Sequence, residues 1–211
     1  MNALVPQREA LCRAGHSLHA RGLTHGSTGN LSLRIDNGWL MTPTGSSLGA
    51  LDPARLSWLD SDGQLIDGDP PTKEAGLHLA LYRARETSTA VVHLHSIHAV
   101  AVSVLADIDP RDVLLPLTAY YVMRVGTLPL LPFFPPGDRG LAETVARFAA
   151  EHPAMLLANH GPLVAGSSLA SAVDAIEEIE ATARLQLLLH GRQVRPLNQA
   201  QVLALRERFA K

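Results

Sequence analysis

The chain has 211 residues, of which 46% are hydrophobic and 18% charged, and its formal net charge is −2. This balance argues against a nucleic-acid partner and a polybasic membrane surface, and no apolar run approaches the roughly 20 residues of a membrane helix. The single cysteine, Cys12, has no internal disulfide partner, which fits a reducing compartment. The first residues lack the basic and apolar regions of a secretory signal, so we expect a cytoplasmic protein. No linker rich in glycine, serine or proline divides the chain, so we expect one domain over residues 1–211.

The first predicted element is a helix over residues 7–21, where apolar side chains recur at helical spacing before Gly22. A loop rich in glycine and hydroxyl residues then leads into an alternating strand over 30–34. Such a loop can present backbone N–H groups to an anion, although an ordinary turn has the same composition. A second strand, Gly38–Met41, ends at a similar loop over 42–47. Two such loops beside adjacent strands favour a shared phosphate pocket.

Short strands over 56–60 and 64–66 precede the next predicted helix, for which Thr72 can supply the N-cap. Glu74 lies in the first turn of this helix, where the helix dipole favours a carboxylate whatever its function. His78 lies four residues further on, on the same helix face, so the two side chains can pair.

Imidazoles gather around a buried strand within residues 90–98. His93 and His95 are two residues apart, and a strand places such residues on the same face. Two neutral imidazoles side by side suit a divalent transition metal, usually zinc, although a His-x-His pair also occurs in strands for structural reasons. His98 is out of step with the strand, and we expect it beside the ligands or as a helix cap.

The second half of the chain is predicted to alternate strands with helices. Residues 111–134 are apolar with short polar breaks, which predicts short strands interrupted by prolines. The continuous apolar run 154–158 is typical of a central strand, and His160 follows at its end. The remaining predicted elements are a helix over 141–149, a paired strand over 163–166, a long helix over 168–189 and a shorter helix over 196–211.

Together, His93, His95 and His160 offer a metal three neutral ligands from two strands. Three protein ligands leave an open coordination position, as a catalytic zinc site requires. Glu74 is a candidate fourth ligand that substrate displaces, after which it can act as a base or an acid.

Taken together and in this order, the motifs resemble the class II aldolase and adducin family over about residues 8–190. The matching motifs are Gly29-Asn30-Leu31-Ser32, Thr44-Gly45, Glu74, His93-Leu94-His95 and Asn159-His160-Gly161. The resemblance implies an α/β protein with a three-layer α/β/α fold around a mostly antiparallel central sheet, usually assembled as a homotetramer with sites near subunit interfaces. It also implies zinc or a similar divalent ion, one per chain, with the ligands Glu74, His93, His95 and His160. The residues that it places near a substrate phosphate are Gly29, Asn30, Ser32, Thr44, Gly45, Thr72 and Lys73.

Within the family, the chain most resembles the members that decarboxylate 3-oxo-tetronate 4-phosphate. The likeness is carried by residues 71–75, 93–103, 120–126 and 158–162. The sugar-phosphate aldolases typically have serine where Lys73 stands, and a lysine adds positive charge beside a phosphate or carboxylate. One aldolase of the family uses a tyrosine in its C-terminal tail, whereas residues 196–211 contain no tyrosine.

The resemblance therefore implies metal-dependent decarboxylation of a small phosphorylated sugar acid to dihydroxyacetone phosphate and CO2, through a metal-stabilised enediolate. We expect Glu74, or Tyr120 or Tyr121 in a mobile lid, to protonate this enediolate. A sugar-phosphate aldolase of the L-fuculose-phosphate type and a ribulose-phosphate 4-epimerase are alternatives, because they share the site or its scaffold. A non-catalytic, adducin-like interaction module is a remote alternative, because such relatives lack the metal residues that this chain retains.

Overall fold

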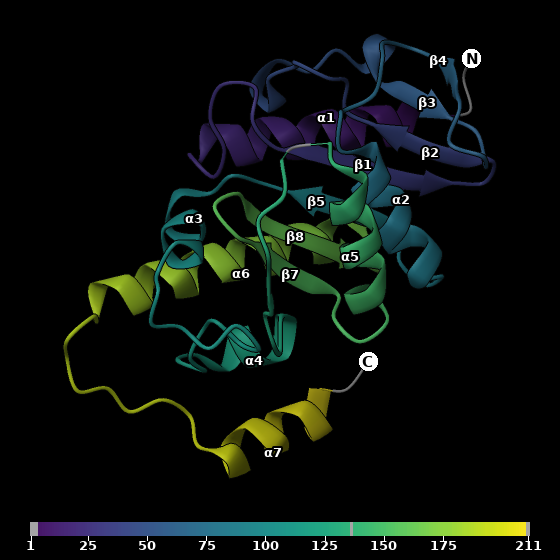
Figure 1. Ribbon diagram of the computed structural model, residues 1–211. Helices are drawn as coiled ribbons and strands as arrows, with labels where there is room; N and C mark the ends of the chain where they lie inside the picture. The colour runs from purple at the N-terminus through teal and green to yellow at the C-terminus, as the bar shows by residue number, and fades with distance from the viewer. Residues whose placement is uncertain (1–3, 136, 210–211) are drawn as a thin grey trace.

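A single mixed sheet of eight strands forms the centre of the computed structural model, which describes residues 4–135 and 137–209 (Figure 1). The strands are β1 (Asn30–Ile35), β2 (Gly38–Met41), β3 (Ser57–Leu59), β4 (Leu65–Asp67), β5 (Ala90–His93), β6 (Leu130–Leu131), β7 (Ala154–Leu157) and β8 (Gly161–Gly166). Their order across the sheet is β4-β3-β2-β1-β5-β8-β7-β6. Every neighbouring pair is antiparallel except β6 and β7. The predicted, mostly antiparallel central sheet is thus confirmed.

Helices cover both faces of this sheet. They are α1 (Val5–Ala20), α2 (Ala75–Ala84), α3 (Ile97–Ser103), α4 (Ala119–Arg124), α5 (Arg139–Ala149), α6 (Leu169–Leu188) and α7 (Gln199–Phe209), with short 3₁₀ turns η2 (Leu48–Ala50) and η3 (Pro53–Arg55). Among the described residues, no helix combines the length and apolar character needed to cross a membrane.

Strand alternation creates two hydrophobic cores, one on each side of the sheet. In β5, Val92 joins a core with residues of α1 and α6, whereas its neighbour Val91 joins a core with residues of α2 and α5. In β7, Leu156 and Met155 divide in the same way. Both faces of β5 and β7 are therefore buried, which explains their continuous apolar runs, and the helices on both sides confirm the three-layer α/β/α architecture.

The segment before β7 differs from its prediction. Residues 111–134 were expected to form several short strands, but only Leu130–Leu131 do, and residues 119–124 form α4. The Thr118 hydroxyl accepts a hydrogen bond from the backbone N–H of Tyr121, 3.1 Å away, and so caps this helix. Aromatic and β-branched residues favour strands on average, but here the cap and packing against α6 decide the conformation. The strand prediction was wrong for this segment.

The start of α2 also departs from expectation. Glu74, not Thr72, occupies the N-cap position. The Thr72 hydroxyl instead accepts a hydrogen bond from the backbone N–H of Glu74, at 3.2 Å. Thr72 therefore holds the turn that presents Glu74, one residue before the helix begins.

Candidate active site

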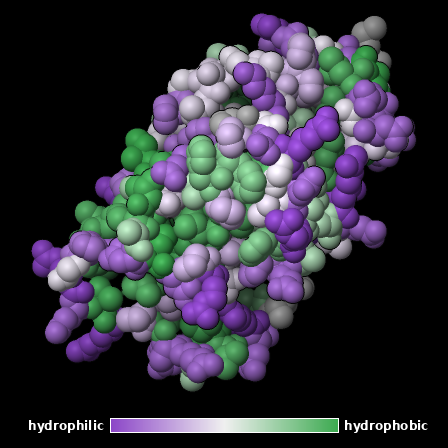
Figure 2. All heavy atoms as spheres, in the orientation of Figure 1, coloured by the Kyte–Doolittle hydropathy of each residue, from purple (hydrophilic) through white to green (hydrophobic). Residues whose placement is uncertain are grey.

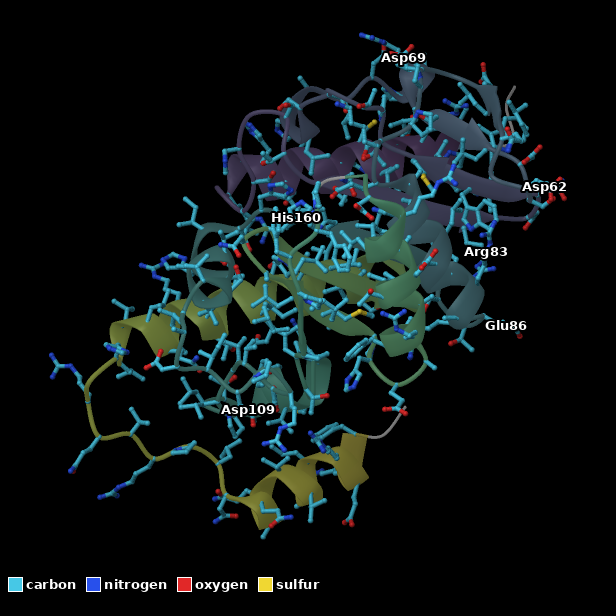
Figure 3. All side chains as sticks on the ribbon, in the orientation of Figure 1. Asp62, Asp69, Arg83, Glu86, Asp109 and His160 are labelled. Carbon is cyan, nitrogen blue, oxygen red and sulfur yellow. The ribbon has the colours of Figure 1, made fainter. Side chains whose placement is uncertain are left out.

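Four side chains that are far apart in the sequence meet at one end of the central strands. Because β1 and β8 both run antiparallel to β5, the starts of β1 and β8 lie beside the end of β5. His93 ends β5, His95 follows it, His160 lies in the turn between β7 and β8, and Glu74 precedes α2. One ligand atom from each of these residues lies within 4.8 Å of all the others. In Figure 3, the labelled His160 lies near the centre of the view, whereas the labelled Asp62, Asp69 and Glu86 lie at its edge.

Different features of the backbone position the three imidazoles. β5 ends at His93, so His95 lies beyond the strand and strand alternation does not explain its position. The two rings nevertheless meet, with centroids 4.9 Å apart. His160 is held between Asn159, with φ 57°, and Gly161, with φ 152°. A Cβ at Gly161 would lie 2.1 Å from the backbone oxygen of Leu94, so this turn requires glycine.

Hydrogen bonds direct free lone pairs into the cluster. His93 Nδ1 donates to the backbone oxygen of Pro162 at 2.9 Å, so its Nε2 lone pair faces His160 Nε2, 3.3 Å away. Glu74 Oε2 accepts a hydrogen bond from Asn30 Nδ2 at 2.8 Å. Glu74 Oε1 is buried and has no hydrogen-bond partner, although His160 Nε2 lies 3.2 Å away. Three nitrogens and a carboxylate with convergent lone pairs are a donor set that fits a divalent transition metal.

The electrostatics of the cluster favour the protonation states that bind a cation. Burial alone would raise the pKa of the Glu74 carboxyl, but His93 and polar contacts with His160 and Asn30 lower this pKa well below its usual range. Burial lowers the pKa of His93, and burial together with the neighbouring His93 lowers the pKa of His95 to about 3. Neutral imidazoles beside an ionised carboxylate are the forms that coordinate a metal.

We expect the metal-free protein to lose stability as the pH falls from about 7 to about 4. Burial lowers the pKa of His78 to about 3, and the pKa of His95 is likewise lowered to about 3. Between pH 7 and pH 4 the unfolded chain therefore binds protons that the folded chain does not. For each such imidazole, the free energy of unfolding falls by up to ~1.4 kcal/mol per pH unit below the unfolded pKa of about 6.5 and is fully retained above it. Urea unfolding across this range measures the effect.

Repeating the urea titrations at low and high salt provides the control, because buried groups are screened far less than surface charges. A free energy of unfolding that stays constant or rises as the pH falls would contradict the prediction.

The cluster opens into a pocket of about 270 Å³ between two loops. The pocket is lined by Ser27, Thr28, Gly29, Asn30, Pro43, Thr44, Gly45, Thr72, Lys73, Glu74, His95 and His160. It therefore contains every residue predicted near a phosphate except Ser32. Gly29 has φ 78°, and a Cβ there would lie 3.0 Å from the backbone oxygen of His93, so this glycine permits the loop to approach the candidate ligands.

Ser32 does not line this pocket, and the prediction that it contacts a phosphate was wrong. Its side chain is fully buried in β1, where Oγ lies 2.6 Å from His78 Nδ1 and 2.9 Å from the Tyr82 hydroxyl. The Asn30 amide is likewise held at both ends, by Glu74 and by His78. The sequence places Glu74 and His78 on one helix face, but it carries no signal that Asn30 joins them.

The structure does not bring the two tyrosines of α4 to the pocket of their own chain. Tyr121 is buried and donates its hydroxyl to Asp112 Oδ1 at 3.2 Å. Burial and this carboxylate raise the pKa of Tyr121 far above its usual range. Tyr120 is exposed, beneath the guanidinium of Arg124. Neither tyrosine lines the pocket of its own chain, and α4 packs on α6; a lid role for α4 and proton donation by either tyrosine stay predictions.

His98 lies outside the group of four, in agreement with its prediction. Its Nδ1 lies 2.7 Å from Glu180 Oε1, and the same carboxylate accepts the backbone N–H groups of His98 and Ala99. This imidazole therefore anchors the start of α3 to α6.

Residues 9–187 match the family described as the Class II Aldolase and Adducin N-terminal domain. This chain therefore belongs to the class II aldolase and adducin family.

Within that family, the likeness to one group of enzymes extends over nearly the whole chain. This chain is 48% identical over 200 residues, which are 94% of each chain, to the 3-oxo-tetronate 4-phosphate decarboxylase of Escherichia coli K12. The crystal structure of YgbL from Escherichia coli superposes with a TM-score of 0.93 at 46% identity, over 95% of this chain and 98% of that one. The L-fuculose phosphate aldolase of Escherichia coli K12 is 34% identical over 168 residues, 79% of this chain and 75% of the aldolase.

Proposed function

We propose that this chain is a metal-dependent carbon–carbon lyase that removes CO2 from a 3-oxo-tetronate 4-phosphate and yields dihydroxyacetone phosphate. The observation that carries the proposal is the cluster of Glu74, His93, His95 and His160 opening into a pocket with two glycine-containing loops and Lys73. Identity of 48% to a decarboxylase of this substrate supports the same assignment.

The proposed roles divide between the cluster and the loops. The three imidazoles and Glu74 would hold the ion, for which we propose zinc. A bound divalent cation supplies a Lewis acid that stabilises negative charge developing on the substrate's carbonyl oxygen. Backbone N–H groups of the loops and the hydroxyls of Thr44 and Thr72 would bind the phosphate. Lys73 would add a positive charge for the phosphate or the carboxylate.

Glu74 is proposed as the acid–base residue of the site. The substrate carboxylate leaves already ionised, so no base is needed to start the reaction. The carbon that loses CO2 keeps the bonding electrons and must receive a proton. Glu74 is the carboxylate among the four clustered residues, and we assign it this transfer: ionised before the reaction, it would take up a proton from water and pass it to the carbon.

Aldol cleavage is a second candidate, because the chain is also 34% identical to an L-fuculose phosphate aldolase. It would use the same cluster, but an aldehyde would leave in place of CO2.

We expect the purified protein to carry about one divalent ion per chain and to release CO2 and dihydroxyacetone phosphate from 3-oxo-tetronate 4-phosphate. Chelation should abolish turnover, and added Zn²⁺ should restore it, because Glu74 and the imidazoles cannot by themselves supply a Lewis acid. Elemental analysis gives the metal content, and the two products are measured separately.

L-Fuculose 1-phosphate is the matched control substrate. Release of an aldehyde from it, with no CO2 from the tetronate, would replace decarboxylation by aldol cleavage as the activity. Full turnover after complete metal removal would refute the metal-dependent mechanism.

We also propose a cytoplasmic homotetramer. Figure 2 shows hydrophobic residues gathered across the middle of the face seen in Figure 1. Large apolar side chains of the described residues that are exposed in one chain include Ile97, Val104, Leu115 and Phe133. In such an assembly, the exposed Tyr120 of one chain would reach a site only in a neighbouring chain. Light scattering tests the assembly against the 22.6 kDa of one chain.

A further inference from the structure

We propose that His78 is a positioning residue for the metal centre, because its ring sets the orientation of the Asn30 amide and this amide holds the Glu74 carboxylate. The inference rests on the proposed metal-dependent function, but concerns a side chain for which that function assigns no role. His78 is fully buried in α2 and does not line the pocket.

Five buried side chains form a continuous chain of hydrogen bonds that ends at Glu74. Their exposed fractions range from 0% to 7%. The links are Tyr82 Oη to Ser32 Oγ at 2.9 Å, Ser32 Oγ to His78 Nδ1 at 2.6 Å, His78 Nε2 to Asn30 Oδ1 at 2.6 Å, and Asn30 Nδ2 to Glu74 Oε2 at 2.8 Å. These hydrogen bonds connect β1 with α2 and end at Glu74 of the proposed metal centre.

With neutral His78 and ionised Glu74, only one arrangement of protons satisfies every link. The ionised carboxylate of Glu74 can only accept, so the NH₂ group of Asn30 must face it. The oxygen of Asn30 then faces His78 and requires a donor, which is Nε2–H. A neutral imidazole carries a single N–H, so Nδ1 of His78 must accept from the Ser32 hydroxyl. The Tyr82 hydroxyl completes the chain by donating to Ser32.

This arrangement determines which way the Asn30 amide points. Without a donor at His78, nothing would prevent the amide from turning its oxygen toward Glu74. Two oxygen atoms that cannot donate would then face each other in a buried site, which is unfavourable. The carboxylate would rotate away, and the unpartnered Oε1 would no longer lie against His160. His78 therefore acts on the metal ligands through Asn30, without touching substrate.

The test compares metal binding in variants of the whole chain, with Co²⁺ alone as the probe. His78→Leu is expected to weaken Co²⁺ affinity by about 10–100-fold, the usual cost of losing a partner of a metal ligand, and to alter the visible absorption of the bound ion. His78→Gln, whose side-chain amide can donate to Asn30, should restore most of the affinity. Competition with a chelator measures these affinities.

Leu81→Ala is the matched control. Leu81 is fully buried on the same helix and lies outside the hydrogen-bonded chain. This variant should lower the Tm and leave Co²⁺ affinity within about twofold, since it creates a cavity without changing the partners of a ligand. A merely structural role for His78 predicts that both variants behave alike.

Equal Co²⁺ affinity and equal spectra for His78→Leu and wild type would overturn the inference while leaving the metal centre intact. A wild-type chain that bound no Co²⁺ would overturn the proposed function, and the inference with it. If His78→Leu does not fold, the ring tautomer decides: ¹⁵N NMR of the wild type should show His78 protonated at Nε2 alone, and protonation at Nδ1 would refute the proposal.

Discussion

Replacing Glu74 with glutamine is expected to lower kcat for decarboxylation by about 10²–10⁴-fold, the usual contribution of a positioned acid or base. Glutamine keeps the size of the side chain and can still accept the hydrogen bond from Asn30, which lies 2.8 Å from Glu74 Oε2. It cannot carry the proton that the reaction consumes, and it removes the negative charge that faces His93 and His160. Steady-state kinetics at a fixed, measured metal content test the prediction.

Glu86→Gln is the control for this variant. Glu86 is an exposed carboxylate that follows α2, far from His160 in Figure 3, and its loss should change kcat by less than about twofold. An unchanged kcat in Glu74→Gln, with full metal content, would remove Glu74 from the mechanism.

Replacing His160 with alanine is expected to cause the second large loss, because it removes one of three nitrogen ligands. Its Nε2 lies 3.3 Å from His93 Nε2, so the alanine variant leaves two imidazoles and one carboxylate around the proposed ion. Affinity for Zn²⁺ should fall by more than ~10–100-fold, which is the usual cost of losing only a hydrogen-bond partner of a metal ligand. Turnover should fall with the affinity. Metal content after dialysis and competition with a chelator measure the effect.

His98→Ala is the matched control, since His98 is an imidazole close in sequence to the ligands but bound to Glu180. It should retain about one ion per chain. If His160→Ala bound Zn²⁺ as tightly as the wild type, the three-histidine site would be wrong.

Much of the fold could be predicted from short-range patterns. The strands β1, β2 and β7 and the helices α1 and α6 lie within two residues of their predicted bounds. Each has a periodic or continuous apolar pattern that is visible within one short window of sequence. α4 was missed because its composition favours a strand, while a single cap at Thr118 and packing on α6 make it a helix.

The candidate ligands were identifiable because three imidazoles follow or end predicted strands, and because their motifs, with Glu74, resemble a known family. The phosphate residues were predicted as a set, and the structure places all but Ser32 around one pocket. Ser32 was misassigned because it belongs to the Gly29-Asn30-Leu31-Ser32 motif of the resemblance, and such a motif does not show which partner each of its side chains meets.

The sequence by itself therefore determined the periodic elements, the candidate metal ligands and the family. Only the tertiary structure decided that His78 supports Asn30, that Tyr121 pairs with Asp112, and that Glu74 meets His160. The physical reason is distance along the chain: Asn30 and His78 are 48 residues apart, and His93 and His160 are 67 apart. Local periodicity depends on neighbours within a few residues, whereas such contacts exist only once the sheet has aligned β1, β5 and β8 and α2 has packed against it.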